Sequence, residues 1–351
     1  MADTLGPLVR LWGITTSQLP ASSATPAGLT PLLMSLLQEA VPFVDSAAPK
    51  SGGAAPAWKS KGSKSLEGST ARIHLTERVV PAAELKLVAG RNPTLPATQS
   101  SGKISSETWI CRRSVHADAA AAGTATWAEF LACIRDAHAE TEVAFTPTVL
   151  GCRDALVWDC GTVEITEGGE SWSGFTLRVE EMKHRIPSPL GNRVFPVMQM
   201  ACSAVPKAEG GRGLQATEEF LVVSVPVVDF ASAPQALMSK EKAVVVGSYV
   251  SVERVRKLPS GEIEWIMATA SDAKGILPMW VQTRAVPGQI AKDVPLFLRW
   301  LQEHRKGLEV PAITEVKGSS TAGGTPVVVA TSGNTATDAT TREQQEPASE
   351  A

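Results

Sequence analysis

The sequence predicts an α+β fold in which a curved antiparallel β-sheet packs around a long C-terminal α-helix. Three observations carry this prediction: a well-capped helix begins near residue 126, strand-like segments follow from 156 to 270, and an amphipathic pattern covers 290–304. An antiparallel sheet with one apolar face needs a cover, and the final helix is the obvious candidate. Apolar residues make up 43% of the chain, so a sizeable core can form.

The N-terminal part is predicted to hold one short helix and a flexible linker. Thr30 precedes Pro31, and an apolar stripe follows over 32–40, as in a helix with a Thr cap and Pro in its first position. Residues 45–68 are rich in Ser, Ala, Gly and Pro, which is typical of a linker. Three lysines on this linker would contact an anionic membrane only weakly; they are Lys59, Lys61 and Lys64.

The central part carries the strongest local signals. Thr126 and Glu129 form a capping box, and the apolar residues that follow at helical spacing predict a core-facing helix. The segment Ser105–Arg113 before it alternates as a half-buried strand does. After the helix the apolar period changes to two, which predicts strands over 156–158, 163–166, 173–180, 194–202, 220–228, 244–257 and 262–270.

The C-terminal helix is predicted to be about 15 residues long, with a kink at Pro295. Beyond residue 308 large apolar side chains are scarce, so this segment cannot offset the entropy of ordering. We therefore divide the chain into an N-terminal helix with its linker (1–68), one folded domain (69–307), and a disordered acidic tail rich in Ser and Thr (308–351).

Charge and composition exclude several classes of protein. Lys and Arg number 33 against 36 Asp and Glu, a net charge of −3, and this balance argues against general nucleic-acid binding. The apolar runs reach about ten residues, whereas a membrane span needs roughly twenty. The start of the chain lacks the pattern of a secretory signal. The five cysteines never form Cys-x-x-Cys, so we expect reduced thiols and a cytoplasmic protein, with peripheral membrane contact as an option.

Known catalytic and cofactor motifs are absent from the sequence. The chain has no Gly-x-Ser-x-Gly nucleophile motif, no Walker loop and no strand-linked Gly-x-Gly-x-x-Gly. Its five histidines are scattered, with no two at positions i and i+4. We therefore predict no catalytic residue, no cofactor and no metal.

The stretch from Glu262 to Trp280 resembles the C-terminal part of START-type lipid-transfer domains, in which the last strand leads through a loop into the closing helix. The chain is more closely similar to an uncharacterised fungal family of START-like proteins, over about residues 30–305. The matching blocks are Trp109–His116, Thr126–Phe130, Phe145–Pro147, Trp172 with Glu181-Met182, Arg193–Val197, Gly247–Arg254, Met267–Asp272 and Val286–Val294. The resemblance implies the helix-grip fold, a curved antiparallel sheet around a long C-terminal helix with a cavity between them.

This resemblance implies a binding protein for a hydrophobic ligand, plausibly a sterol or a phospholipid, without catalysis. Such a protein needs an apolar cavity, a few polar groups and a movable lid. The cavity candidates are Tyr249, Ser251, Trp265, Met267, Thr269, Ile290, Phe297 and Leu301. The loop after the last strand is the candidate gate, through Asp272, Gly275, Pro278 and Trp280.

Two other functions remain open at this stage. Helix-grip relatives include polyketide cyclases, so an enzyme that acts on an apolar substrate is one alternative; its acid–base groups would come from Glu253, Arg254, His116 and Asp118. The other alternative is an interaction scaffold with a collapsed cavity. A void of only a few tens of Å3 would favour this scaffold, because ligand sites measure roughly 300 Å3 or more.

Overall fold

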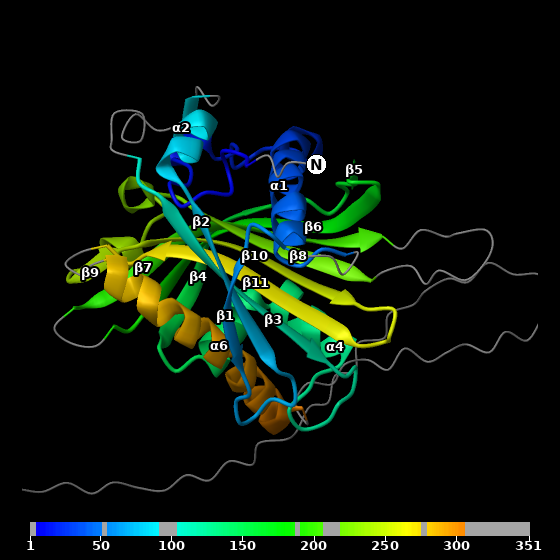
Figure 1. Cartoon of the computed structure of the whole chain (residues 1–351). Coiled ribbons are helices and arrows are strands. Elements are labelled where there is room, and N and C mark those ends of the chain that lie inside the picture. Colours follow the sequence, from blue (N-terminus) through cyan, green and yellow to red (C-terminus); the bar gives the residue numbers. More distant parts are fainter. Residues whose placement is uncertain are drawn as a thin grey trace, which may run out of the picture. The chain divides into compact units, whose positions relative to one another are not determined.

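The computed structural model describes residues 5–50, 55–90, 104–186, 190–205, 218–274 and 279–305 (Figure 1). The predicted tail 308–351 lies outside these residues. Residues on both sides of the predicted boundary at 68 belong to one compact unit.

A single large sheet forms the centre of the described part of the chain. Its main path has the order β1-β2-β3-β11-β10-β8-β7-β6-β4, and two short strands, β5 and β9, pair with β6 and β7. Every pairing is antiparallel except the one between β7 and β9. The strands are β1 (Lys59–Lys64), β2 (Ile73–Val80), β3 (Glu107–His116), β4 (Val149–Trp158), β5 (Ile165–Glu167), β6 (Glu170–His184), β7 (Asn192–Val205), β8 (Glu219–Pro226), β9 (Val244–Val246), β10 (Ser248–Lys257) and β11 (Ile263–Asp272).

The long helix α6 (Met279–His304) covers one face of this sheet and confirms the predicted helix-grip arrangement (Figure 1). Its inward side chains pack on apolar residues of β2, β3, β8 and β11; they are Ile290, Ala291, Val294, Phe297, Leu298 and Leu301. The helix has 26 residues and includes both Pro287 and Pro295. The helix does not restart at Pro295, because burial of the stripe on both sides of it outweighs the cost of a helical proline, about 3 kcal/mol, and a kink there stays a prediction.

A second helix, α1 (Pro26–Ala47), covers the opposite face of the sheet. Thr25 caps it by accepting a hydrogen bond from the Gly28 amide, and Pro26 follows in the first helical position. The helix thus starts at an earlier Thr-Pro pair than the predicted Thr30-Pro31. Among the described helices, α1 is long and apolar enough to cross a membrane by length and composition, but its apolar side packs on the sheet.

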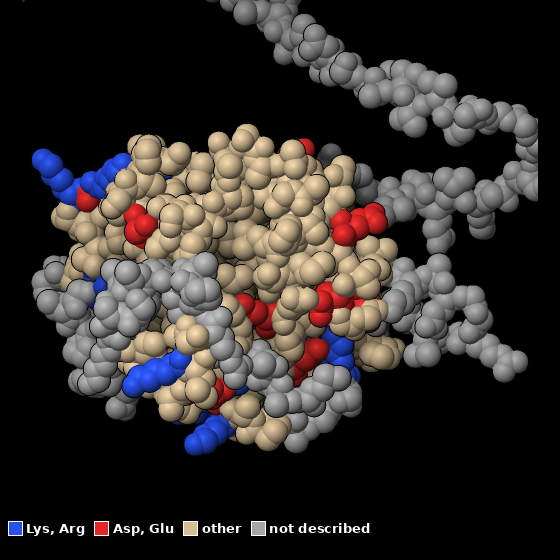
Figure 2. Space-filling model, turned by 90° about the horizontal axis from the view of Figure 1, so that it is seen from above, with Lys and Arg blue, Asp and Glu red and all other residues tan. Residues whose placement is uncertain are grey.

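The surface around α1 carries few charges. The helix itself contains only Glu39 and Asp45 as charged residues. Glu39 accepts hydrogen bonds from the backbone amides of Leu8 and Val9, and Asp45 pairs with Arg254 of β10. Seen from above, Lys, Arg, Asp and Glu are sparse over most of this side of the molecule (Figure 2).

The predicted linker 45–68 differs from the structure, which places an edge strand within it. β1 pairs with β2, and the short helix α2 (Ala82–Gly90) follows β2. Sequence alternation cannot reveal β1, because an edge strand exposed on both faces needs no apolar side chains. β2 does carry an alternation of apolar and polar residues, with Ile73 and Leu75 buried towards α6. This strand was not predicted from the sequence.

The predicted helix at 126 begins at the expected cap. Thr126 Oγ1 accepts from the Glu129 amide at 3.2 Å, and Glu129 Oε2 accepts from the Thr126 amide at 2.7 Å. The helix then divides into α4 (Trp127–Phe130), a π-helical turn η2 (Leu131–Asp136) and α5 (His138–Phe145). This division starts α5 at His138 and places Glu142 one turn later on the same side. Short 3₁₀ turns complete the described elements: η1 (Thr16–Gln18), η3 (Phe230–Ser232) and η4 (Met238–Lys240).

Phe297→Ala is expected to lower the free energy of unfolding by about 3–5 kcal/mol, because the Phe297 ring packs between the rings of Phe130, Phe145 and Trp265. Urea unfolding followed by tryptophan fluorescence measures this loss. Gln302→Ala on the exposed side of α6 is the control and should change stability little. A loss below about 1 kcal/mol for Phe297→Ala would contradict the packing of α6 on the sheet.

Candidate functional site

Three neighbouring strands place polar and sulfur-containing side chains side by side beneath α6. Arg112 of β3 pairs in register with Met267 of β11, which in turn pairs with Glu253 of β10. α5 approaches this row with His138 and Glu142, and α6 approaches with Asp293. These groups surround a cavity of about 50 Å3, lined by Arg112, Ile134, His138, Glu142, Phe145, Glu253, Trp265, Met267 and Asp293.

Arg112 is the most unusual member of the site. Its side chain is 2% exposed, and one terminal nitrogen, Nη2, lies 3.1 Å from Glu253 Oε1. The guanidinium centre lies 3.9 Å from the centre of the Trp265 ring, a cation–π contact. Nε and Nη1 find no hydrogen-bond acceptor in the described part of the chain. A buried arginine that keeps free N–H donors at a cavity is suited to an acceptor group on a ligand.

Glu253 lies between two cations. Its second oxygen is 3.0 Å from His138 Nε2, and Trp265 Nε1 donates to its first oxygen at 2.6 Å. Burial opposes the charge on Glu253, but the hydrogen bond from His138 and the Arg112 charge keep the pKa of Glu253 below its usual value. Burial likewise opposes the imidazolium, but the hydrogen bond and charge of Glu253 raise the pKa of His138 to about 9. At neutral pH the ionised carboxylate of Glu253 therefore lies between two cations, Arg112 and protonated His138.

Glu142 and Asp293, the other two carboxyls that line the cavity, form no ion pair with any described residue. Burial raises the pKa of Glu142 to about 7 and that of Asp293 to about 6. Glu180, on β6 beside the cavity, has its pKa raised to about 7 by burial as well. Near pH 7 these carboxyls can donate or accept a proton. One wall of the larger cavity, formed by Arg112, His138 and Glu253, is thus charged at neutral pH. The carboxyls of Glu142 and Asp293 on the other wall can change their protonation near pH 7.

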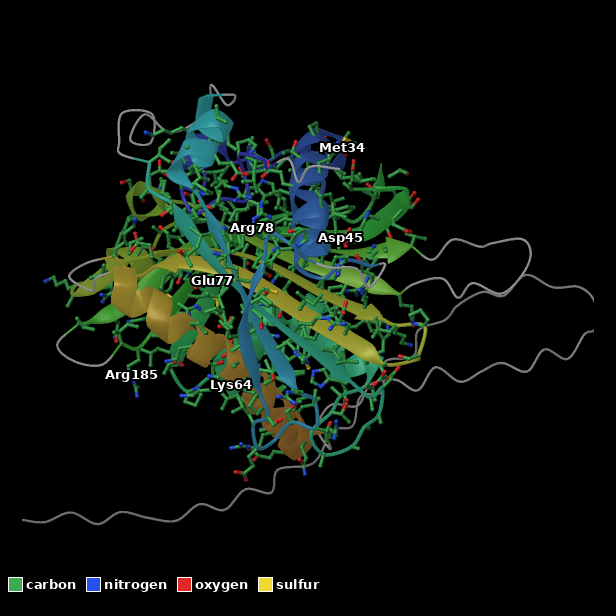
Figure 3. The ribbon with its side chains drawn as sticks, in the orientation of Figure 1. Met34, Asp45, Lys64, Glu77, Arg78 and Arg185 are labelled. Atoms are coloured by element: carbon green, nitrogen blue, oxygen red, sulfur yellow. The ribbon has the colours of Figure 1, made fainter. Side chains whose placement is uncertain are left out.

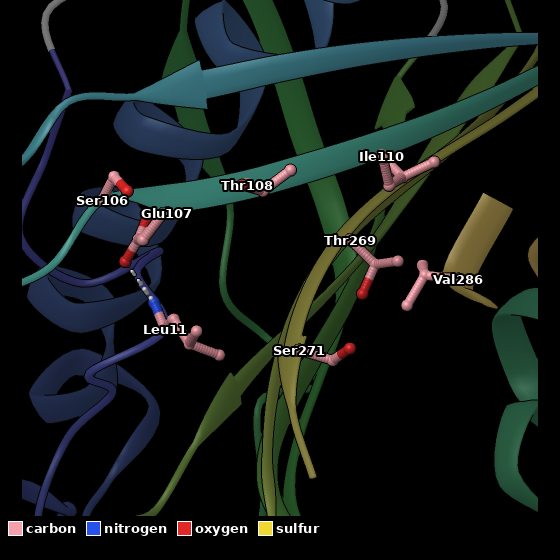
Figure 4. A pocket seen from close by; sticks show the side chains of 8 residues that line it. All are labelled: Leu11, Ser106, Glu107, Thr108, Ile110, Thr269, Ser271 and Val286. Atoms are coloured by element: carbon pink, nitrogen blue, oxygen red, sulfur yellow. Dashed lines mark hydrogen bonds between the residues drawn. The ribbon is translucent and has the colours of Figure 1, made fainter. Parts of the chain in front are cut away.

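A second, smaller cavity of about 30 Å3 lies nearer the start of β3 (Figure 4). Hydroxyl groups contribute much of its lining, which comprises Leu11, Ser106, Glu107, Thr108, Ile110, Thr269, Ser271 and Val286. The Leu11 amide donates to Glu107 Oε1 at 2.8 Å and holds the N-terminal segment at its rim.

The two cavities follow one another along the same elements. From the smaller to the larger, the lining moves two residues along β3 and β11, about 7 Å, and seven residues along α6, about 10 Å. Ile110 lines the smaller cavity and Met267 the larger one, and Ile290 is a buried α6 residue between Val286 and Asp293. The two cavities are therefore neighbours along the α6 face of the sheet and are separate from each other.

The predicted cavity residues divide into three groups. Trp265 and Met267 line the larger cavity and Thr269 the smaller one. The others do not line either cavity: Ile290, Phe297 and Leu301 are core residues of α6, while Tyr249 and Ser251 lie on the same face of β10 as Glu253. Their contact with a ligand stays a prediction.

Tyr249 and Ser251 continue the polar surface beyond the larger cavity. The Tyr249 hydroxyl lies 3.9 Å from the sulfur of Met182, and its ring packs on Phe195. Burial, together with the charges of Glu142 and Glu180, raises the pKa of Tyr249 well above its usual value. Ser251 pairs in register with Thr269 on one side and Ser224 on the other.

The predicted gate is only partly described. Asp272 is the last residue of β11 and binds Lys274 in two ways. Its Oδ1 accepts a hydrogen bond from the Lys274 amide at 2.9 Å, and its Oδ2 lies 2.6 Å from Lys274 Nζ. Gly275 and Pro278 lie outside the described residues. Trp280 falls in the first turn of α6, and its side chain lies outside them as well. Opening of this loop stays a prediction.

Of the acid–base groups considered for an enzyme, only Glu253 reaches the larger cavity. Arg254 points to the opposite face and donates to Asp45 and, at 2.8 Å, to the Ala48 carbonyl oxygen. His116 and Asp118 do not form the considered pair, because β3 ends at His116 and the chain turns. His116 Nε2 lies 2.8 Å from Ser114 Oγ, and Asp118 binds the Trp127 amide.

Sequence reasoning missed four of the functional side chains: Arg112, His138, Glu142 and Asp293. Arg112 and Asp293 lie inside the family-like blocks Trp109–His116 and Val286–Val294, which were used only for the resemblance. His138 and Glu142 are four residues apart on one helix, a spacing that signals a shared face. In the described ranges, no cluster of His, Cys, Asp and Glu has the arrangement of a metal site.

The groups of the larger cavity are expected to make stability fall as the pH rises from 5 to 9. Among the residues that the structure describes, this fall is opposed below pH 6.5 only by His116 and His184, whose pKa values burial lowers to about 4. The raised pKa values of Glu142 and Asp293 give stability that is complete below their unfolded values and lost as the pH passes about 7 and about 6. The raised pKa of His138 gives stability that is complete below 6.5 and lost as the pH passes about 9. The midpoint of thermal unfolding, measured at several pH values, reports this slope.

Two variants separate these contributions. Glu142→Gln should weaken the fall of the thermal midpoint with pH between pH 5 and 7. His138→Gln should weaken this fall between pH 7 and 9. Both expectations hold whatever either substitution does to the midpoint at a single pH. A wild-type midpoint that rises with pH between 7 and 9, where His116 and His184 no longer titrate, or an unchanged slope in both variants, would contradict the assignment.

Three solved structures are similar to this chain over most of its length. Human STARD10 is 15% identical, with 77% of this chain and 84% of that chain covered and a TM-score of 0.43. Human StAR-related lipid transfer protein 5 is 12% identical, with 81% and 99% covered and a TM-score of 0.44. The human StarD13 (DLC2) lipid transfer and protein localization domain is 11% identical, with 74% and 95% covered and a TM-score of 0.37.

A comparison with curated proteins gives no significant match. The model of a family described as "Protein of unknown function (DUF3074)" matches residues 109–301, more than half of the 351 residues. This range includes all the residues that form the charged wall of the larger cavity. The chain therefore belongs to the DUF3074 family.

Proposed function

We propose that the chain binds a hydrophobic ligand, a sterol or a phospholipid, between the sheet and α6, without catalysis. The observation that carries this proposal is Arg112, whose side chain is 2% exposed and keeps unpaired N–H donors at the larger cavity. The ligand's polar group accepts from these donors. Its apolar part lies along a path that opens towards the smaller cavity.

The site selects for a group that both accepts and donates hydrogen bonds. Arg112 supplies only donors, whereas Glu142 and Asp293 on the same cavity can accept from a ligand when ionised. A hydroxyl can satisfy both sides at once. A zwitterionic head can do the same, with its anionic oxygen on Arg112 and its cationic end towards the carboxyls.

The cavities as they stand hold a polar group and not a lipid chain. Their volumes of about 50 and 30 Å3 are far below the roughly 300 Å3 of a ligand site. This is the volume expected for the collapsed-cavity scaffold. Binding therefore requires Ile110, Met267 and Ile290 to move apart, and burial of ten methylene groups, about 8 kcal/mol before costs, is large enough to drive that movement.

Acid–base chemistry is the second candidate function. Carboxyls with pKa values of about 6 and about 7 line the same cavity as Trp265 and Phe145, so a general acid or base would have an apolar substrate beside it. Turnover of a bound apolar substrate that is lost in Glu142→Gln and Asp293→Asn would favour this function.

Native mass spectrometry of the purified full chain, followed by organic extraction, tests ligand binding directly. The chain is then incubated with vesicles that contain dehydroergosterol or a fluorescent phosphatidylcholine. We expect adducts of one lipid class, and Arg112→Met should weaken its binding by about 10- to 100-fold through loss of charged hydrogen bonds. Arg254→Met removes an equally buried arginine on the opposite face and is the matched control.

Three results would contradict the proposal: a wild-type chain without adducts that also takes up neither probe, equal binding by Arg112→Met, or an equal loss in the Arg254→Met control. The last result would trace the loss to general destabilisation and not to the cavity.

Met267 is expected to control the connection between the cavities. Met267→Ala removes part of the wall and should raise the rate of probe uptake several-fold, whereas Met267→Trp should fill the path and abolish uptake. Met198→Ala, a buried methionine on the α1 face, is the control and should leave uptake unchanged. Stopped-flow fluorescence with the same probes measures the rate. Uptake that is indifferent to both substitutions would mean that the ligand does not pass this point.

A further inference from the structure

The edge strand β1 carries three lysines that the ligand site does not use. It is the last strand on its side of the sheet, and its outer edge pairs with no described strand. Lys59, Lys61 and Lys64 are exposed. Lys64 and the partner strand's Glu77 lie along this β1–β2 hairpin in Figure 3.

The register turns these lysines to the face of the sheet that α6 covers. Lys59 pairs with Glu77 and Lys64 with Ile73, and Ile73 packs towards α6. A bulge between Ser60 and Ser63 resets the alternation, so Lys64 returns to the face of Lys59. Lys64 reaches α6 at Gly288, where an added Cβ would lie 4.0 Å from its Nζ. Lys292, one turn further along α6, is exposed beside it.

These four lysines, Lys59, Lys61, Lys64 and Lys292, form what we call the basic edge. Glu77 lies 3.3 Å from Lys61 Nζ. Lys59 and Lys64 make no ion pair with any described residue, so the edge keeps an excess of positive charge in solution.

Exposed apolar side chains continue the basic edge. Val79 lies two residues beyond Glu77 on the same face and is 52% exposed, and Leu87 on α2 is 64% exposed. Val79 pairs in register with Thr108, which lines the smaller cavity. The β1 lysines, Val79 and the lining of the smaller cavity therefore lie along the three neighbouring strands β1, β2 and β3.

We propose that the basic edge, together with Val79 and Leu87, docks the protein on an anionic membrane surface. Phosphate-bearing lipid heads match several lysines on one strand, and the acyl region below them takes up the apolar side chains. A nucleic acid would use the lysines but not Val79 and Leu87. Docking in this orientation turns the smaller cavity towards the bilayer. The inference goes beyond the proposed function, since docking needs no ligand in the cavity.

Vesicle flotation of the full chain tests the docking. Vesicles of phosphatidylcholine alone are compared with mixtures that contain phosphatidylserine, at low and high salt. We expect binding to the anionic vesicles that salt weakens, and a loss of roughly tenfold or more in Lys59→Glu/Lys64→Glu. The matched control, Lys240→Glu/Lys242→Glu, makes the same charge change on exposed residues near β9 and should bind as wild type does.

Val79→Ser, which adds no charge, tests the apolar part of the surface. It should weaken binding to both kinds of vesicle, because the loss of an inserting apolar side chain does not depend on lipid charge. Circular dichroism and thermal midpoints of all variants show that the sheet is intact.

The proposal is overturned if wild type does not prefer anionic vesicles, if Lys59→Glu/Lys64→Glu binds as well as wild type, or if the control loses binding equally. Failure of the proposed function is a separate result. Native mass spectrometry of Lys59→Glu/Lys64→Glu reads ligand content without vesicles, so adducts that persist while flotation is lost support both proposals. Vesicle binding by a wild-type chain without adducts supports docking alone.

Discussion

Glu253 of β10 joins the sheet to α5 at the larger cavity. Its carboxylate contacts Arg112 from β3, Trp265 from β11 and His138 from α5. Removal of any one partner would leave a buried charge or donor uncompensated, and such losses cost far more than a surface ion pair contributes. The position of α5, and with it Glu142, depends on this carboxylate. The larger cavity lies between these charged groups and the apolar side chains of Ile134 and Phe145.

The two faces of the sheet use buried arginines in different ways. On the α1 face, Arg10 binds Glu107 at 3.2 Å and lies over the rings of Phe43 and Trp109. Arg254 gives both terminal nitrogens to acceptors at the end of α1. These arginines join the helix to the sheet and lie in close-packed surroundings. Within the described ranges, Arg112 on the α6 face leaves both Nε and Nη1 unpaired at the larger cavity, whereas Arg254 leaves only Nε unpaired and lines neither cavity.

A path that opens between the two cavities, as proposed, would make their small volumes compatible with a large ligand. Three apolar side chains would move apart, and one of them, Met267, is unbranched and adapts its shape readily. Their separation exposes apolar surface that a lipid chain covers again. An apolar ligand would thus replace protein contacts with equivalent ones, and the polar cavity would fix its head. The lysines of β1 lie two strands away from the β3 residues that line the smaller cavity.

Local sequence signals determined the elements that neighbouring residues specify. The capping box at Thr126, the alternation from β6 to β11 and the apolar stripe of α6 follow from spacing along the chain, and with the resemblance they indicated the helix-grip arrangement. Only the tertiary structure decided where α1 packs, that β1 is a strand, and which polar groups meet. β1 has no apolar pattern to detect, and Arg112, His138, Glu253 and Asp293 lie on four separate elements. Their shared cavity depends on strand register and helix packing, which no local pattern encodes.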